Sequence, residues 1–134
     1  MDMQTSILLE ARNPEWKWEL IIYQPLFSKA RPRMTKSGHT YMPQAYRDAQ
    51  KEMRLALREQ WVDAPLDQPV ILHMDVRGEG RGDADNIMGA FFDSAVGIVF
   101  TDDRVKYIPQ VSFKWHKAAK KDSMWRILMT PYSE

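Results

Sequence analysis

The stretch RGDADNIMGAFFDSAVGIVFTDDRVKY, residues 81–107, decides how this chain folds. Carboxylates gather at its two ends, with Asp83 and Asp85 before a largely apolar segment and Asp102 and Asp103 after it. The first pair can begin a helix, because short acidic side chains accept hydrogen bonds from the free backbone N–H groups at a helix start. The sequence therefore predicts a helix with acids on both flanks.

The apolar residues of this segment recur at helical spacing, which predicts one inward face. Gly97 indicates the end of the helix, since glycine readily adopts the conformation that follows the last helical turn. The expected inward residues are Ile87, Met88, Phe91, Phe92 and Ala95.

The rest of the chain supplies a second helix and four strands. The helix is expected over Gln44–Trp61, where apolar residues recur every three or four positions. Residues 28–43 are rich in Pro, Gly, Ser and cations and predict a long basic loop. The resulting order, β-α-β-α-β-β, predicts a compact α/β fold with a mixed sheet packed by helices, and the length suits a single domain over residues 1–134. The expected strands are Trp16–Tyr23, Pro69–Arg77, Val105–Trp115 and Met124–Met129.

Composition narrows the class of protein. An apolar share of 44% with 28% charged residues is ordinary for a soluble globular domain, and no run approaches the roughly 18 apolar residues of a membrane span. The absence of cysteine excludes disulfides, thiolate zinc sites and a cysteine nucleophile. The amino-terminal segment lacks the features of a signal peptide, so we expect a cytoplasmic protein with no membrane partner.

The net charge of +1 hides three blocks of opposite sign. Lys29–Arg58 and Arg104–Arg126 each carry +6, whereas Asp75–Asp103 between them carries −5. Basic flanks around an acidic centre suit a metal-dependent enzyme that acts on a polyanion, because cations hold phosphates while carboxylates hold the metal. Ordinary variation of surface charge explains the same pattern equally well.

The four flanking carboxylates are candidate ligands for a hard cation such as Mg²⁺ or Mn²⁺, which prefers oxygen. Asp83 and Asp85 lie two positions apart, and Asp102 and Asp103 follow after one helix that could fold back toward them. Such a site could polarise a scissile phosphate and activate water. The alternative is structural, with the first pair capping a helix and the second pair lying in a solvated turn.

The residues resemble those of a known family. The motif GDADN, an apolar helix that contains Asp93, and then TDDRVKY resemble the signature of the RusA-type Holliday-junction resolvases, endonucleases of bacteria and their phages. The upstream KARPRMTKSGHTYMPQAYRD is similar to the basic loop and following helix of phage-type members. The resemblance covers about residues 20–115, and the ordered set of motifs is specific.

The resemblance implies a function and a site. Asp83 and Asp85 match the paired catalytic acids of the family, Asp103 matches the third, and Asp102 matches a neighbouring acid that is a further candidate metal ligand. The family is similar in being dimeric and magnesium-dependent and in nicking two opposed strands of a four-way DNA junction. A homodimer suits this substrate, because two-fold symmetry supplies two active sites for a two-fold junction.

One position departs from the pattern. Gly89 stands four residues after Asp85, where the family has a lysine that can reach the phosphate. Three explanations stay open: another cation takes its place, the protein cuts weakly, or it binds branched DNA without cutting. The substitute cations considered are Lys36, Arg81, Arg104 and Lys106.

The remaining cations suggest how DNA is held. Four residues of the basic loop are candidate phosphate contacts, together with Arg81, Arg104 and Lys106. The cluster Lys114, Lys117, Lys120 and Lys121 suggests a second phosphate-binding edge, although a charged turn explains it as well. The leading hypothesis is a homodimeric, Mg²⁺-dependent endonuclease; the alternatives are a branched-DNA binder that does not cut and an unrelated domain with structural acids. The four loop residues are Lys29, Arg31, Arg33 and Lys36.

Overall fold

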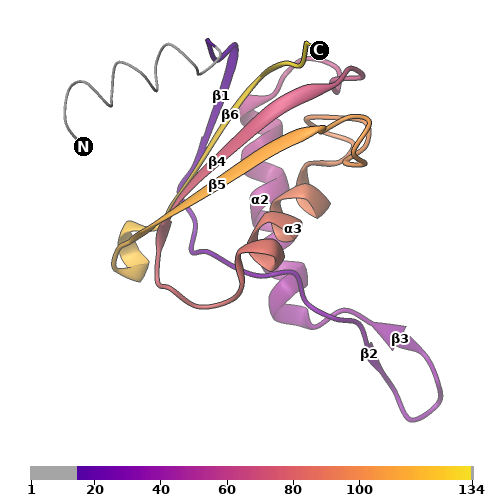
Figure 1. Ribbon diagram of the computed structural model, residues 1–134. Helices are drawn as coiled ribbons and strands as arrows, with labels where there is room; N and C mark the ends of the chain where they lie inside the picture. The colour runs from indigo at the N-terminus through magenta and orange to yellow at the C-terminus, as the bar shows by residue number, and fades with distance from the viewer. Residues whose placement is uncertain (1–14, 134) are drawn as a thin grey trace.

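The computed structural model describes residues 15–133 (Figure 1). The prediction made from the amino-terminal segment lies outside these residues. One mixed sheet has the strand order β1-β6-β4-β5, in which β4 and β5 are parallel and the other neighbours antiparallel. A second, two-stranded pairing joins β2 and β3. The strands are β1 (Trp18–Ile22), β2 (Arg33–Met34), β3 (Thr40–Tyr41), β4 (Val70–Gly78), β5 (Gln110–Lys117) and β6 (Met124–Pro131).

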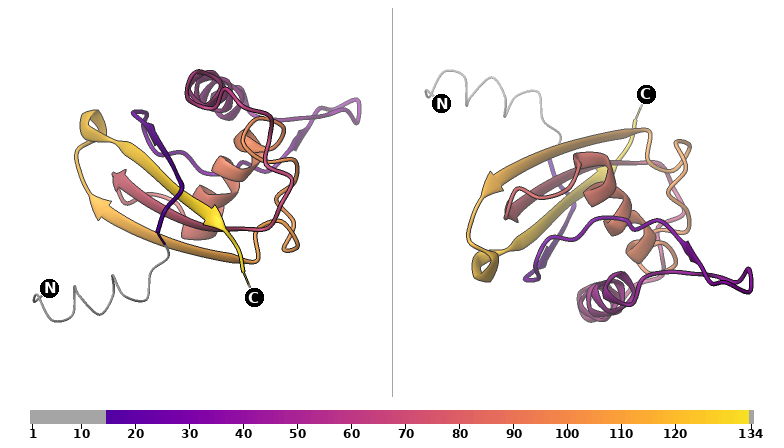
Figure 2. Two further views of the ribbon diagram at one scale, coloured as in Figure 1. Left: turned by 90° about the horizontal axis from the view of Figure 1, so that it is seen from above. Right: turned by 90° about the horizontal axis from the view of Figure 1, so that it is seen from below.

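Two helices, α2 (Gln44–Gln60) and α3 (Ala84–Ala95), cover one face of the four-stranded sheet (Figure 2). The alternation of buried and less buried residues along β4 places Leu72, Met74 and Val76 against them. Trp125 and Ile127 of β6 are fully buried in the same core. The predicted α/β class and element order are confirmed, with a short hairpin added.

The expected inward residues of α3 form its core contact. Ile87, Phe91 and Ala95 are buried, and Met88 and Phe92 pack at the edge of the cluster. The aromatic rings of Phe91, Phe92 and Phe100 lie within 6.2 Å of one another, centroid to centroid. This face anchors α3 firmly on the sheet, since buried aromatic side chains contribute strongly to core packing.

The basic segment after β1 is more ordered than a plain loop. Residues 33–41 form the hairpin β2–β3, which projects away from the body (Figures 1 and 2). Thr35 and His39 close its turn through their backbone groups, and Gly38 supplies the positive φ of 88° that the turn requires. The predicted long basic loop over residues 28–43 therefore contains a short hairpin that the sequence analysis did not expect.

The start of β5 was also placed too early. Residues 104–108 form a turn in which the N–H groups of Tyr107 and Ile108 donate to the carbonyl of Arg104. Pro109 then provides no N–H for a strand ladder, and pairing with β4 begins at Gln110. Between β5 and β6 a short 3₁₀ helix, η1 (Lys120–Asp122), forms the basic turn.

The other face of the sheet is polar. His73 of β4 stacks on Trp16, and its Nδ1 lies 2.6 Å from the Ser112 hydroxyl of β5. The Nε2 of His116 lies 3.0 Å from a carboxylate oxygen of Asp75. Within residues 15–133, neither helix is long and apolar enough to cross a bilayer.

Candidate metal and nucleic-acid site

The start of α3 holds the first carboxylate pair. Asp83 is the N-cap residue, yet its side chain makes no capping hydrogen bond. Its backbone carbonyl instead accepts hydrogen bonds from the N–H groups of Asn86 and Ile87, at 3.1 and 3.0 Å. The expected capping role of the carboxylate was therefore wrong, and both of its oxygens remain free of helix bonds.

Asp85 lies in the first turn of α3 and is exposed. One of its carboxylate oxygens accepts a 2.9 Å hydrogen bond from the N–H of the adjacent Asn86. Within the described residues, neither Asp83 nor Asp85 takes part in an ion pair. The fold thus presents two exposed carboxylates whose remaining oxygens face solvent, and such oxygens suit a hard divalent cation.

The turn before Asp83 has a special backbone. Gly82 has a φ of 87°, and a Cβ atom placed there would clash with the hydroxyl of Ser28. Glycine therefore allows the segment after β1 to run directly beneath the start of α3. This close approach brings Lys29 onto the helix, where its backbone N–H donates to the carbonyl of Asn86 at 2.7 Å.

The second carboxylate pair behaves differently. Asp102 accepts hydrogen bonds from the backbone N–H of Arg104, at 3.0 Å, and from its Nε, at 2.6 Å. These bonds, the backbone one foremost, hold the pKa of Asp102 below its usual range. Asp103 is exposed and, among residues 15–133, has no ion pair. Of the two neighbours, Asp103 is the freer candidate ligand.

The two pairs lie at opposite ends of α3. The helix of 12 residues is about 18 Å long at the usual rise, and the segment after it is tied to the start of β4, where Thr101 donates to the Leu66 carbonyl. Within residues 15–133 of one chain, no three His, Asp or Glu side chains lie close enough to hold a metal ion. The expected return of the chain toward Asp83 was wrong, because β4 and β5 are parallel and the helix must travel the length of the sheet.

Gly89 faces a cation that the sequence reasoning did not consider for this position. A Cβ atom at Gly89 would lie 3.3 Å from Cδ of Lys29, so the lysine stem crosses the helix at the glycine. The Nζ of Lys29 pairs with Asp93, one turn further along, at 3.5 Å. The absence of a side chain at position 89 thus makes room for Lys29.

Asp93, which the sequence placed on the helix between the two acid pairs, joins three segments. Its carboxylate accepts a 3.0 Å hydrogen bond from the hydroxyl of Tyr46 on α2 and pairs with Lys29. Burial, together with the charge and hydrogen bond of Asp93, raises the pKa of Tyr46. Arg54 adds a second link between the helices, donating to the Ser94 carbonyl at 3.2 Å.

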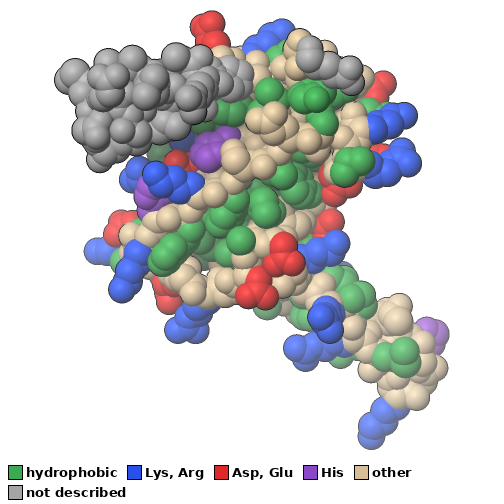
Figure 3. All heavy atoms as spheres, in the orientation of Figure 1, with side chains coloured by type: hydrophobic (Ala, Val, Ile, Leu, Met, Phe, Trp, Pro, Cys, Tyr) green, Lys and Arg blue, Asp and Glu red, His purple; other side chains and the backbone are tan. Residues whose placement is uncertain are grey.

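The other predicted DNA-binding cations fall into two groups. Arg31, Arg33 and Lys36 lie on or beside the projecting hairpin, where all of residues 31–41 are exposed. Arg104 and Lys106 lie at the far end of α3, with Lys106 over the ring of Tyr107 at 5.4 Å. Figure 3 shows Lys and Arg side chains on both sides of an acidic group at the base of the body.

Comparison with known proteins identifies the family of this chain. The model of a family described as endodeoxyribonuclease RusA matches residues 23–120, well over half of the chain. The chain belongs to this family, and membership implies a junction-resolving endodeoxyribonuclease. A search of curated proteins finds no match.

The part of the site that sequence reasoning missed is the contact of Lys29 with α3. Lys29 was considered only as a phosphate contact of a loop. Lys29 and Gly89 are 60 positions apart in the sequence, and no local pattern links the two. The one signal in the sequence was a glycine inside a helix at the position where the family has a lysine.

Proposed function

We propose that this protein is a homodimeric, divalent-metal-dependent endonuclease that resolves four-way DNA junctions by paired nicks. The observation that carries the proposal is the state of Asp83 and Asp85, whose carboxylates are exposed and, among residues 15–133, form no ion pair. In an endodeoxyribonuclease family, such carboxylates serve as ligands for a metal beside the scissile phosphate.

The metal site requires two chains. Asp83 and Asp85 lie at one end of α3 and Asp103 follows the other, so one chain offers a single ion only part of a ligand set. A two-fold axis that relates two α3 helices antiparallel would bring the first pair to the partner subunit's Asp103. This explains physically why the protein should act as a dimer, and it yields two equivalent sites.

The donor set fits Mg²⁺ or Mn²⁺, since both prefer carboxylate oxygens and tolerate water and phosphate oxygens in the remaining positions. A bound ion would supply Lewis acidity to the scissile phosphate and promote ionisation of water. Asp83 and Asp85 would hold the ion, and the cations Arg31 and Arg33, on or beside the hairpin, would hold the DNA strand. Asp102 keeps its turn in shape through Arg104.

Lys29 supplies the cation that position 89 lacks. Its stem lies over Gly89, on the turn that follows Asp85, and its Nζ pairs with a carboxylate that is only partly buried. An exposed ion pair of this kind is weak, so the ammonium group can exchange Asp93 for a phosphate oxygen at small cost. A phosphate at Asp85 would then meet a positive charge from a different segment.

An intersubunit complementation experiment tests the shared site. Asp85→Asn and Asp103→Asn chains are purified alone and after co-expression, and each preparation is incubated with a labelled four-way junction and Mg²⁺. Each variant alone should bind and fail to nick. The mixed dimer should regain one intact site and nick a single strand, because both substitutions fall in the other site. A mixed dimer that stays inactive, beside an active wild type, contradicts the shared site.

The same assay separates the second candidate, a branched-DNA binder that does not cut, which the glycine at position 89 favours. Tight binding of the wild-type protein to the junction without nicks, in Mg²⁺ and in Mn²⁺, would establish that alternative. Nicks that a chelator abolishes would exclude it. Equal binding to a linear duplex and to the junction would contradict both.

A further inference from the structure

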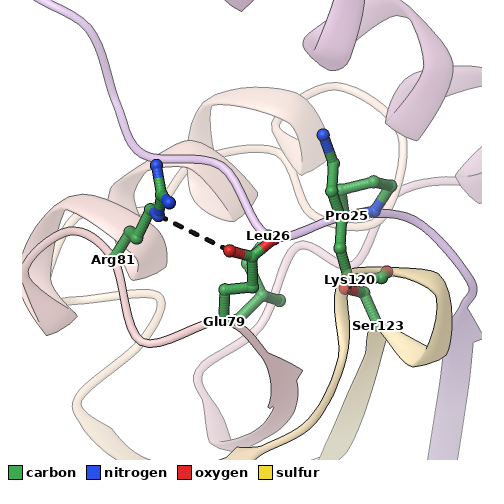
Figure 4. A pocket seen from close by; sticks show the side chains of 6 residues that line it. All are labelled: Pro25, Leu26, Glu79, Arg81, Lys120 and Ser123. Atoms are coloured by element: carbon green, nitrogen blue, oxygen red, sulfur yellow. Dashed lines mark hydrogen bonds and ion pairs between the residues drawn. The ribbon is translucent and has the colours of Figure 1, made fainter.

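A basic groove surrounds η1, at the end of the sheet where β4 and β5 finish. Three adjoining hollows of about 300, 750 and 590 Å³ make it up, and all three share Lys120. Figure 4 shows the smallest, in which Arg81 and Lys120 stand on two sides with Glu79 between them. We name this surface the η1 groove; its cations are Arg77, Arg81, Lys117, Lys120 and Lys121.

The charges of the η1 groove are available to a ligand. Its five cations face only two acids, Glu79 and Asp122. Arg81 pairs with Glu79 at 3.5 Å, but the arginine side chain is 89% exposed, so this pair contributes little. Within the described residues, none of the other four cations forms an ion pair.

The floor of the groove is tightly packed around Gly78. A Cβ atom at Gly78 would lie 2.8 Å from Cγ of Leu26 and 3.1 Å from the Ser123 hydroxyl, so glycine allows three segments to meet here. The same hydroxyl donates to the Lys120 carbonyl at 2.7 Å. The buried indole of Trp125 donates to the Gln24 carbonyl at 3.2 Å. The cations therefore project from a fixed base.

The position of the groove relates it to the start of α3. The turn of residues 79–83 lines the groove at Glu79 and Arg81 and leads directly into Asp83. The basic hairpin β2–β3 extends on the other side of this helix end (Figure 1). Figure 3 shows the resulting order along the base of the body, with basic, acidic and again basic side chains.

We propose that the η1 groove binds the phosphodiester backbone of a DNA arm, on the side of Asp83 and Asp85 opposite to the hairpin. This inference rests on the proposed function, and it adds a second phosphate-binding surface to the hairpin. DNA is the occupant that fits, because regularly spaced phosphates match several lysines along an open groove. A strand held at both ends positions the phosphate between them over the carboxylates.

Neutralisation tests the groove. Lys117, Lys120 and Lys121 are replaced together by Gln, and a matched control replaces Arg47, Lys51 and Arg58 on the exposed side of α2, which removes the same charge. Binding to a labelled four-way junction is measured in chelator across a range of salt concentrations. The slope of log affinity against log salt should become shallower by about 0.9 for each phosphate that the groove variant no longer neutralises. The α2 variant should keep the wild-type slope.

Two results would overturn the proposal: a wild-type slope in the groove variant, or an equal change in both variants, which would indicate a general charge effect. Glu79→Gln supplies a test of opposite sign, because removing an acid from the groove should strengthen binding and weakening would contradict the proposal. If wild-type protein nicks the junction and the groove variants bind it as wild type does, the groove alone is wrong. If wild-type protein ignores the junction, the proposed function fails as well.

Discussion

The two ends of α3 carry the same number of carboxylates and use them differently. At the start of the helix, Asp83 makes no side-chain capping bond and Asp85 bonds only the N–H of the next residue. After its end, Asp102 receives two hydrogen bonds from Arg104, whereas Asp103 remains exposed. Adjacent acids in one motif therefore divide into those that shape the backbone and those left for a ligand.

The hydrogen bonds of each acid indicate whether it is available as a metal ligand. A carboxylate that accepts bonds from its own turn is already neutralised in part, so its use as a metal ligand would disrupt the turn. The carboxylate of Asp83 accepts no capping bond and that of Asp85 accepts only one, from the next residue, so both keep oxygens for a ligand. The bonding of each acid in the free protein thus ranks the candidates: Asp83, Asp85 and Asp103 ahead of Asp102.

The largest expected effect contrasts one acid from each class. Asp85→Asn should lower the nicking rate on a four-way junction by on the order of 1000-fold or more, because a metal ligand is removed beside the reacting phosphate. Asp102→Asn should leave the rate within about 10-fold of wild type, since only turn geometry changes. Single-turnover nicking measures both. Equal losses of nicking rate in the two variants would contradict the distinction between ligand acids and acids that hold a turn.

A second pair of variants examines the cation at the start of α3. Lys29→Ala should slow nicking by about 100-fold through the loss of positive charge near the phosphate. Adding Gly89→Lys to this variant should restore most of the rate, because the stem of Lys29 no longer occupies the space over position 89. Lys51→Ala, on the exposed side of α2, serves as the control. Failure of Gly89→Lys to rescue, in a folded protein, would argue against Lys29 as the substitute.

Asp93 is a carboxylate on α3 with a structural role, because it links α3 to Tyr46 of α2 and to Lys29. Tyr46→Phe removes its hydrogen bond from α2 and should lower the free energy of unfolding by about 1–2 kcal/mol while leaving nicking almost unchanged. The raised pKa of Tyr46 also predicts that wild-type stability falls above about pH 10, because the unfolded chain there loses a proton that the folded chain retains. Urea unfolding at pH 7 and pH 11 checks both, and Tyr46→Phe should weaken the alkaline loss.

The smallest effect concerns the sheet rather than the helix ends. Burial lowers the pKa of His73, with Asp75 opposing the shift. As the pH falls below about 6.5, the unfolded chain binds a proton that the folded chain resists, so stability decreases. His73→Asn should flatten this dependence in thermal melts between pH 7 and 5, compared with the wild-type protein. An unaltered pH profile for His73→Asn would contradict the role of burial.

The main elements could be predicted because their patterns are local. Residues 70–78 alternate, and Ile87, Phe91 and Ala95 repeat at helical spacing, so both kinds of element were recognised. The hairpin β2–β3 has only two residues in each strand, too few for alternation to appear. The start of β5 was misplaced because Val105 and Tyr107 look strand-like, while the turn around Arg104 and Pro109 decides otherwise.

The candidate site likewise has features that a local motif predicts and features that depend on long-range packing. The positions of the acids were read from the motif, but the direction of β5 relative to β4 sets which acids can meet, and no short pattern encodes it. The contact of Lys29 with Gly89 depends on a segment that passes beneath α3 because Gly82 lets it approach. Which acids can meet, and which cation lies at Gly89, are therefore set by long-range packing and cannot be read from the motifs.

The place of β6 in the sheet has a consequence for biosynthesis. The last of the strands lies between β1 and β4, and its pairing with β1 joins residues as distant in sequence as Trp18 and Met129. Consider a nascent chain that has emerged from the ribosome only as far as α3. It already contains Asp83 and Asp85, but it lacks β6, the strand that pairs with both β1 and β4. Such long-range pairing is slow to form, so we expect stable structure only after β6 has been translated, which keeps a half-made nuclease inactive.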